Sequence, residues 1–296
     1  MPATTAKVFV KDEEEQPCLD EYDEETFSHK TELENRLLPF AHYVSFHENL
    51  TWDDRRKLVK RFLLYCKRFD LSFDILFLAV HCVDCFLSRK KTGDHLGVLG
   101  AVAFVSAVRY LGDRDFSLSI LDLHPPYGIF YKTRDLRDIQ AQLLETLDHC
   151  LGMPSPFYFL SRLATLHRPQ IGISNLAEYL AASTVLHEDF IGFRPSQIAA
   201  ASFFLSQCLL KTFKSEVDRS NFVWSDQHRR ISGYERRDIQ QLSTLLFYNI
   251  RQKGVTESLD VLTNNLGTYQ DVAATIERAK RARIGFSVLR VESYDS

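Results

Sequence analysis

The fold class follows from the stretch Asp74-Ile-Leu-Phe-Leu-Ala-Val-His-Cys-Val-Asp-Cys-Phe-Leu-Ser88. Its side chains are apolar almost all round, and residues 96–111 have the same character. A helix without a polar face is stable only where neighbouring elements cover every side of it. We therefore expect these two segments to be helices at the centre of a helical bundle.

The segments around this stretch also have helical periodicity. Apolar residues recur every three or four positions from Leu136 to Leu151, which is one face of a helix of about four turns. Val-rich alternating runs bounded by Asn-Gly or Asp-Gly turns are absent from the sequence. We predict an all-α protein.

The second half of the sequence repeats the first at an offset of about 100 residues. Matching amphipathic helices can arise by chance, but three matches in the same order favour a tandem duplication of a helical unit. The matched segments are Phe77-Leu-Ala79 with Tyr179-Leu-Ala181, Phe104-Val-Ser106 with Phe204-Leu-Ser206, and Arg137-Asp-Ile-Gln140 with Arg237-Asp-Ile-Gln240.

Composition excludes several classes of protein. The net charge of −3 does not suggest binding to nucleic acid or to a membrane surface, and no apolar run approaches the ~20 residues of a membrane span. No signal peptide is recognisable, so we expect an intracellular protein with reduced thiols. Nine carboxylates lie between Asp12 and Glu25, and we expect residues 1–21 to form a disordered acidic tail.

Motifs of enzyme and metal sites are missing or incomplete. The sequence has no Gly-rich phosphate loop, no Gly-x-Ser-x-Gly and no His-Glu-x-x-His, so we expect no catalysis and no cofactor. Cys82 and Cys85 have zinc or redox spacing, but no second pair completes a metal site, and we expect buried structural thiols. His81 fits a core histidine better than a catalytic base.

The central stretch 74–88 resembles the signature of the cyclin box. Further motifs of that family occur in order from about Tyr22 to Ile250: Leu50-Thr-Trp-Asp-Asp-Arg55, the Leu and Pro pattern of residues 144–160, Leu176-Ala-Glu-Tyr-Leu180, Pro195-Ser-Gln-Ile-Ala-Ala-Ala201 and Ser232-Gly-Tyr234. The A/B branch of the family matches best. The resemblance implies two tandem five-helix cyclin folds, with these divisions: tail 1–21, N-terminal box with a preceding helix 22–152, C-terminal fold 153–255 and C-terminal extension 256–296.

The resemblance also implies functional residues. A carboxylate in an apolar helix needs a partner, and the family pairs the residue at Asp84 with the one at Arg55. The family's kinase-contacting Lys and Glu correspond to Arg109 and Gln140. The remaining kinase-binding candidates are Phe130, Tyr131, Leu136 and Ile139. The implied partner is a cyclin-dependent protein kinase, in the nucleus and/or the cytoplasm.

A second surface departs from the family's pattern. The apolar substrate-docking patch of cell-cycle cyclins corresponds here to Asp54, Lys57, Leu58, Arg61 and Gly97. We expect this degenerate patch not to bind apolar docking peptides. It is either a solvated basic face or a surface that accepts acidic or phosphorylated segments.

Two alternative functions remain open at this stage. A general transcription factor built on cyclin folds would need a basic DNA-binding face and usually a zinc ribbon, and here the N-terminus is acidic with a single Cys18. A cyclin-fold scaffold that no longer activates a kinase is the other alternative, because Gln140 lacks the carboxylate of the family. We expect a non-catalytic subunit that activates a kinase and controls cell cycle progression.

Overall fold

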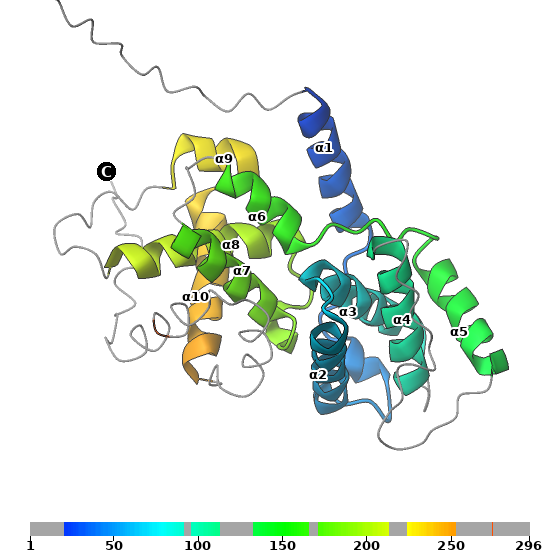
Figure 1. Cartoon of the computed structure of the whole chain (residues 1–296). Helices are drawn as coiled ribbons and strands as arrows, with labels where there is room; N and C mark the ends of the chain where they lie inside the picture. The colour runs from blue at the N-terminus through cyan, green and yellow to red at the C-terminus, as the bar shows by residue number, and fades with distance from the viewer. Residues whose placement is uncertain are drawn as a thin grey trace, which may run out of the picture.

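A computed structural model describes residues 21–91, 96–112, 133–165, 171–212 and 224–252, together with residue 274. Within these ranges the chain forms helices and no strand, in two groups that follow each other in sequence (Figure 1). The first group consists of α1 (Glu21–Arg36), the 3-10 helix η1 (Tyr43–Phe46), α2 (Trp52–Phe69), α3 (Phe73–Leu87), α4 (Leu96–Leu111) and α5 (Thr133–Thr146).

The second group has the same plan. It consists of α6 (Pro156–Ala164), α7 (Ile171–Thr184), the 3-10 helix η3 (Glu188–Phe190), α8 (Pro195–Thr212), α9 (Asp226–Ser232) and α10 (Arg236–Gln252). The predicted all-α architecture of two tandem units is confirmed. Residues 1–20 of the expected tail and most of the expected C-terminal extension lie outside the described residues, and Glu21, which was assigned to the tail, begins α1. None of the described helices is long and apolar enough to cross a membrane.

Each unit is built around one buried helix. In the first unit α4 packs against α2, α3 and α5, and in the second α8 packs against α6, α7 and α10. Phe104 of α4 stacks near Phe62 at 5.2 Å between ring centroids, and Phe204 of α8 lies 6.1 Å from Trp224. The three matched sequence segments fall in α3 and α7, in α4 and α8, and in α5 and α10, so the sequence repeat is a repeat of helices.

Helix α1 packs against the second unit, although it precedes the first. The Phe27 ring lies 5.9 Å from the Phe159 ring, and the Arg162 guanidinium lies 4.4 Å from the Phe27 ring centroid. The carboxylate of Glu34 is fully buried and accepts hydrogen bonds from the backbone N–H (3.0 Å) and the hydroxyl (2.5 Å) of Ser196. Ser196 lies in the first turn of α8, where an anion is favoured by the helix dipole.

Candidate functional site

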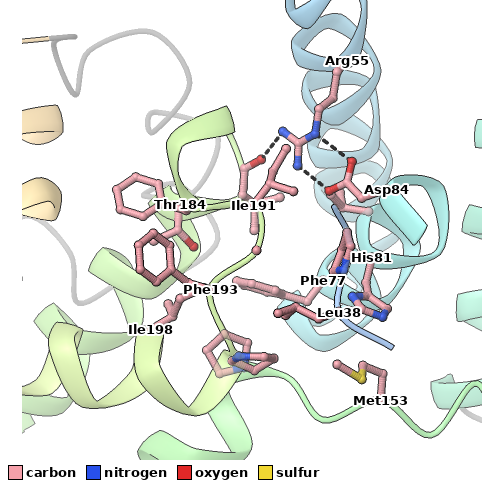
Figure 2. Close-up of a pocket in the computed structure, with 17 residues that line it drawn as sticks. Leu38, Arg55, Phe77, His81, Asp84, Met153, Thr184, Ile191, Phe193 and Ile198 are labelled. Carbon is pink, nitrogen blue, oxygen red and sulfur yellow. Dashed lines mark hydrogen bonds and ion pairs between the residues drawn. The ribbon is translucent and has the colours of Figure 1, made fainter. Parts of the chain in front are cut away.

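A buried ion pair lies at the junction of the two units (Figure 2). Arg55 of α2 donates from Nε to Asp84 Oδ1 at 2.8 Å and from Nη2 to Asp84 Oδ2 at 2.7 Å. The two residues are 3 % and 4 % exposed. Burial lowers the pKa of Arg55, but the charge of Asp84 outweighs this effect and holds the pKa above its ordinary value. The structure therefore contains the ion pair that the sequence resemblance implied.

Two groups that the sequence did not indicate complete this network. The hydroxyl of Tyr43 in η1 donates to Asp84 Oδ1 at 2.8 Å, and Arg55 Nη1 donates to the backbone carbonyl of Val185 at 2.9 Å. Burial raises the pKa of Tyr43 far above its ordinary value, and the Asp84 charge adds to the shift, so the phenol stays a neutral donor. Because Val185 follows α7, the network joins both units. No short-range signal points to either residue, since each lies far from its partner in sequence.

A cavity of about 70 Å³ adjoins the network. Figure 2 shows side chains from both units around it, among them Phe77, Met153, Phe193 and Ile198. Its walls are mostly apolar, and the polar residues that line it are Arg55, His81, Asp84 and Thr184. Burial is the main reason that the pKa of His81 falls to about 4, so this imidazole is neutral near pH 7.

The surroundings of the Cys82 and Cys85 thiols are those of core residues and not of a metal or redox site. Both are buried, and Cys85 Sγ lies 2.9 Å from the Leu37 carbonyl and 3.2 Å from His81 Nε2. Burial raises the pKa of Cys85 to about 12, which keeps the thiol protonated and unreactive. The described residues contain no cluster of three ligands suited to a metal ion.

Some of the kinase-binding candidates lie on two helices that are in contact, α4 and α5. Arg109 is exposed in the last turn of α4, whereas Leu136, Ile139 and Gln140 are half-buried on α5. Phe130 and Tyr131 lie outside the described residues. The structure thus places four of the six candidates on neighbouring helices.

The same end of α4 exposes two large apolar residues that were not among the candidates. Tyr110 is 51 % exposed and Leu111 is 43 % exposed. The hydroxyl of Tyr110 lies 3.1 Å from the position that a Cβ on Gly152 would take, so it reaches the segment that follows α5. The sequence could have indicated their exposure, because two large apolar residues stand at the end of a helix, directly before Gly112. We define Arg109, Tyr110, Leu111, Leu136, Ile139 and Gln140 as the α4–α5 face.

The residues of the expected docking patch do not form one exposed surface, because each has a different local environment. Asp54 forms a capping box with Thr51 at the start of α2, and Lys57 Nζ lies 2.7 Å from Asp53 Oδ2. Leu58 is 5 % exposed and packs on Gly100 of α4, where an added Cβ would lie 2.5 Å from Leu58 Cδ1. Leu58 therefore belongs to the core and not to an exposed patch, because α2 and α4 approach closely at this glycine. Arg61 and Gly97 are half-buried.

Comparison with protein families gives two matches that cover most of the chain. The family profile described as "Cyclin, N-terminal domain" matches residues 25–152, and "Cyclin, C-terminal domain" matches residues 154–270. The G2/mitotic-specific cyclin-4 of Candida albicans is 26% identical over 93% of this chain and 51% of its own length. The G2/mitotic-specific cyclin-4 of Saccharomyces cerevisiae is 28% identical over 78% of this chain and 48% of its own length.

A solved structure has the same fold. A viral cyclin from herpesvirus saimiri superposes with a TM-score of 0.58 and 16% identity, over 75% of this chain and 96% of that structure. At this identity the likeness concerns the fold alone. The chain spans about half the length of the curated relatives that it matches.

Proposed function

Since this chain belongs to the cyclin family, we propose that it is a non-catalytic regulatory subunit that binds and activates a cyclin-dependent protein kinase and so controls progression of the cell cycle. The relatives named above are G2/mitotic-specific cyclins, which supports a role in that cycle. We place the protein in the nucleus and/or the cytoplasm, where such a kinase would meet it.

The α4–α5 face is the observation that carries this proposal. It combines an exposed cation, Arg109, with the exposed side chains of Tyr110 and Leu111 and the half-buried apolar side chains of α5. Aromatic and arginine side chains of this kind dominate the binding energy of protein interfaces. The face is part of the first unit, as the resemblance to cyclins implies for a kinase-binding surface.

The mechanism would be a shift between two kinase conformations. The subunit would bind the active placement of the kinase's mobile helix more tightly than the inactive one. A shift from mostly inactive to mostly active kinase needs about 5 kcal/mol of differential affinity. A contact centred on the α4–α5 face can supply it, because an exposed Arg and several apolar anchors act together there. The subunit itself moves no proton and makes no covalent bond.

A double substitution in this face tests the proposal. The chain is mixed with a purified cyclin-dependent kinase, and both complex formation and phosphorylation of a substrate peptide are measured. We expect Arg109→Ala with Ile139→Asp to abolish both. Arg237→Ala with Tyr248→Asp is the matched control, because both residues are exposed on the equivalent helix α10. Full binding by the first variant would refute the assigned face.

A scaffold without kinase activation is the second candidate, and Gln140 favours it. The amide accepts a hydrogen bond but lacks the negative charge that a Glu would offer near Arg109. In the same assay, a stable complex with no gain in phosphorylation would support the scaffold and exclude activation.

A further inference from the structure

Helix α2 carries a line of cations on the side that faces away from the core. Lys60, Leu64, Lys67 and Arg68 are exposed and Arg61 is half-buried, and their spacing places them on one face of the helix. The opposite face, which includes Val59, Phe62, Leu63 and Cys66, is buried in the first unit. We call Lys60, Arg61, Leu64, Lys67 and Arg68 the cationic stripe.

Within the described residues the cations of the stripe form no ion pair, although Lys60 is near enough to the Asp53 carboxylate for the two charges to interact. Lys57, one turn earlier, forms ion pairs with Asp53 (2.7 Å) and Asp54 (3.8 Å). By contrast, none of the four cations of the stripe forms an ion pair in the part of the chain that the structure describes. The stripe therefore concentrates four positive charges in a chain whose net charge is −3.

A large apolar side chain lies in the middle of these cations. Leu64 is 56 % exposed, which is the highest value among the large apolar residues of the described chain. Lys60 and Arg61 lie one turn before it, and Lys67 and Arg68 lie one turn after it. A ligand that fits this arrangement has carboxylates on both sides of one apolar side chain.

The stripe is short because carboxylates bound it. Asp53 and Asp54 lie at the start of α2, and Asp70 lies at its C-terminal cap. From Lys60 to Arg68 the helix rises by about 12 Å, which matches four or five residues of extended peptide. A longer polyanion, such as a nucleic acid, would extend past the stripe onto these carboxylates and gain no further contact with the four cations. The length thus favours a short acidic segment of a protein.

We propose that the cationic stripe is a docking surface for a short acidic peptide segment with a central apolar residue, carried by proteins that the bound kinase phosphorylates. This inference rests on the proposed function for the source of the peptide. The cations of the stripe would bind the carboxylates of the peptide through charge-assisted hydrogen bonds, and Leu64 would pack against the peptide's apolar side chain. The segment would raise the local concentration of a substrate at the kinase.

A labelled peptide tests the surface without any kinase. The full chain is titrated into a fluorescein-labelled peptide with the core Asp-Glu-Leu-Glu-Asp, and its anisotropy is recorded at several salt concentrations. We expect binding that weakens with salt and that falls at least tenfold in Lys60→Glu with Lys67→Glu. Leu64→Ser should weaken it roughly fivefold through lost apolar contact. The peptide Asn-Gln-Leu-Gln-Asn should not bind.

Arg230→Glu with Arg237→Glu is the matched charge control, since both arginines are exposed in the second unit. Equal loss of binding in this control would show a general charge effect and overturn the proposal. An oligonucleotide or vesicles of anionic lipid that displace the peptide at lower concentration would also overturn it, in favour of another polyanion.

The kinase complex then separates the two proposals. In the complex, Lys60→Glu with Lys67→Glu should lower kcat/KM at least fivefold for a substrate that carries the acidic segment, and leave a substrate without it unchanged. If the chain binds the peptide but no kinase, the proposed function fails and the docking surface stands. If it activates a kinase, but the kinase phosphorylates both substrates equally well in complex with the variant and with the original chain, the docking surface fails alone.

Discussion

Helices α5 and α10 contain the same four residues, Arg-Asp-Ile-Gln, but the two units bury them differently. Ile239 in α10 is fully buried, whereas Ile139 in α5 is half-buried. Four later apolar residues of α10 are buried as well: Leu242, Leu246, Phe247 and Ile250. Among the described side chains of α5, Leu143 alone of the apolar ones is buried.

The comparison shows that the repeated sequence forms a helix in both units, but that neighbouring elements do not bury the two helices to the same extent. Ile239, which the second unit buries in its own core, has a partly exposed counterpart in the first unit, Ile139. An amphipathic helix with a partly uncovered apolar face fits a surface that a partner completes. The α4–α5 face therefore includes a helix that is less buried than its counterpart in the second unit.

The largest effect on stability should come from replacing the matching isoleucines of α5 and α10 by aspartate. Ile239→Asp puts a carboxylate in the core without a partner, and we expect loss of a cooperative unfolding transition for the second unit. Ile139→Asp should cost less than about 1.5 kcal/mol, because its side chain keeps contact with water. Urea unfolding followed by circular dichroism measures both. Equal destabilisation would mean that α5 is as fully covered as α10.

For buried polar groups the difference between the two units should have the opposite direction, with the larger effect in the first unit. Asp84→Asn leaves the buried Arg55 without a counter-charge and should lower the free energy of unfolding by about 3–5 kcal/mol. Ser243 of α10 is also buried, and its hydroxyl donates to the Ile239 carbonyl at 2.8 Å. Ser243→Ala should cost only about 1 kcal/mol, because a neutral hydrogen bond is lost. A smaller cost for Asp84→Asn than for Ser243→Ala would contradict this view of the ion pair.

Acid should weaken the first unit through His81. Its pKa is lowered from 6.5 to about 4 in the folded protein, mainly by burial. The contribution of His81 to the free energy of unfolding is therefore fully present above pH 6.5. It falls, by up to about 1.4 kcal/mol per pH unit, as the pH drops from 6.5 towards 4. The repeat aligns His81 with Ser183, which does not titrate. In His81→Ser this part of the pH dependence should disappear from unfolding curves, and a persistent slope would assign it to another group.

The smallest effect concerns the shared glutamine. Gln140→Glu restores a charge on the α4–α5 face and should tighten kinase binding by up to about tenfold or leave it unchanged, depending on how near Arg109 lies in the complex. Gln240→Glu is the control at the matching position of α10 and should have no effect. Titration calorimetry with the kinase measures both, and a clear loss of affinity in Gln140→Glu would show that the interface requires the amide.

Much of this architecture could be predicted from the sequence, because helix periodicity and the repeat depend on residues close together in the chain. The pair Arg55 and Asp84 came from the family motif. The burial of Leu58 could not be predicted, since it depends on the close approach of α2 to Gly100. The contacts of Tyr43 and Val185 were also missed, because they join segments that are distant in sequence.

The hydrogen bonds between Glu34 and Ser196 have a consequence for synthesis of the chain on the ribosome. The two residues are 162 positions apart, so α1 leaves the ribosome long before its partner does. At roughly 5–20 residues per second, the delay is about 8–30 seconds. During this interval Phe27 and the Glu34 carboxylate have no docking site in the second unit. The nascent chain therefore exposes its first helix until the second unit has been made, and a chaperone could bind it in that interval.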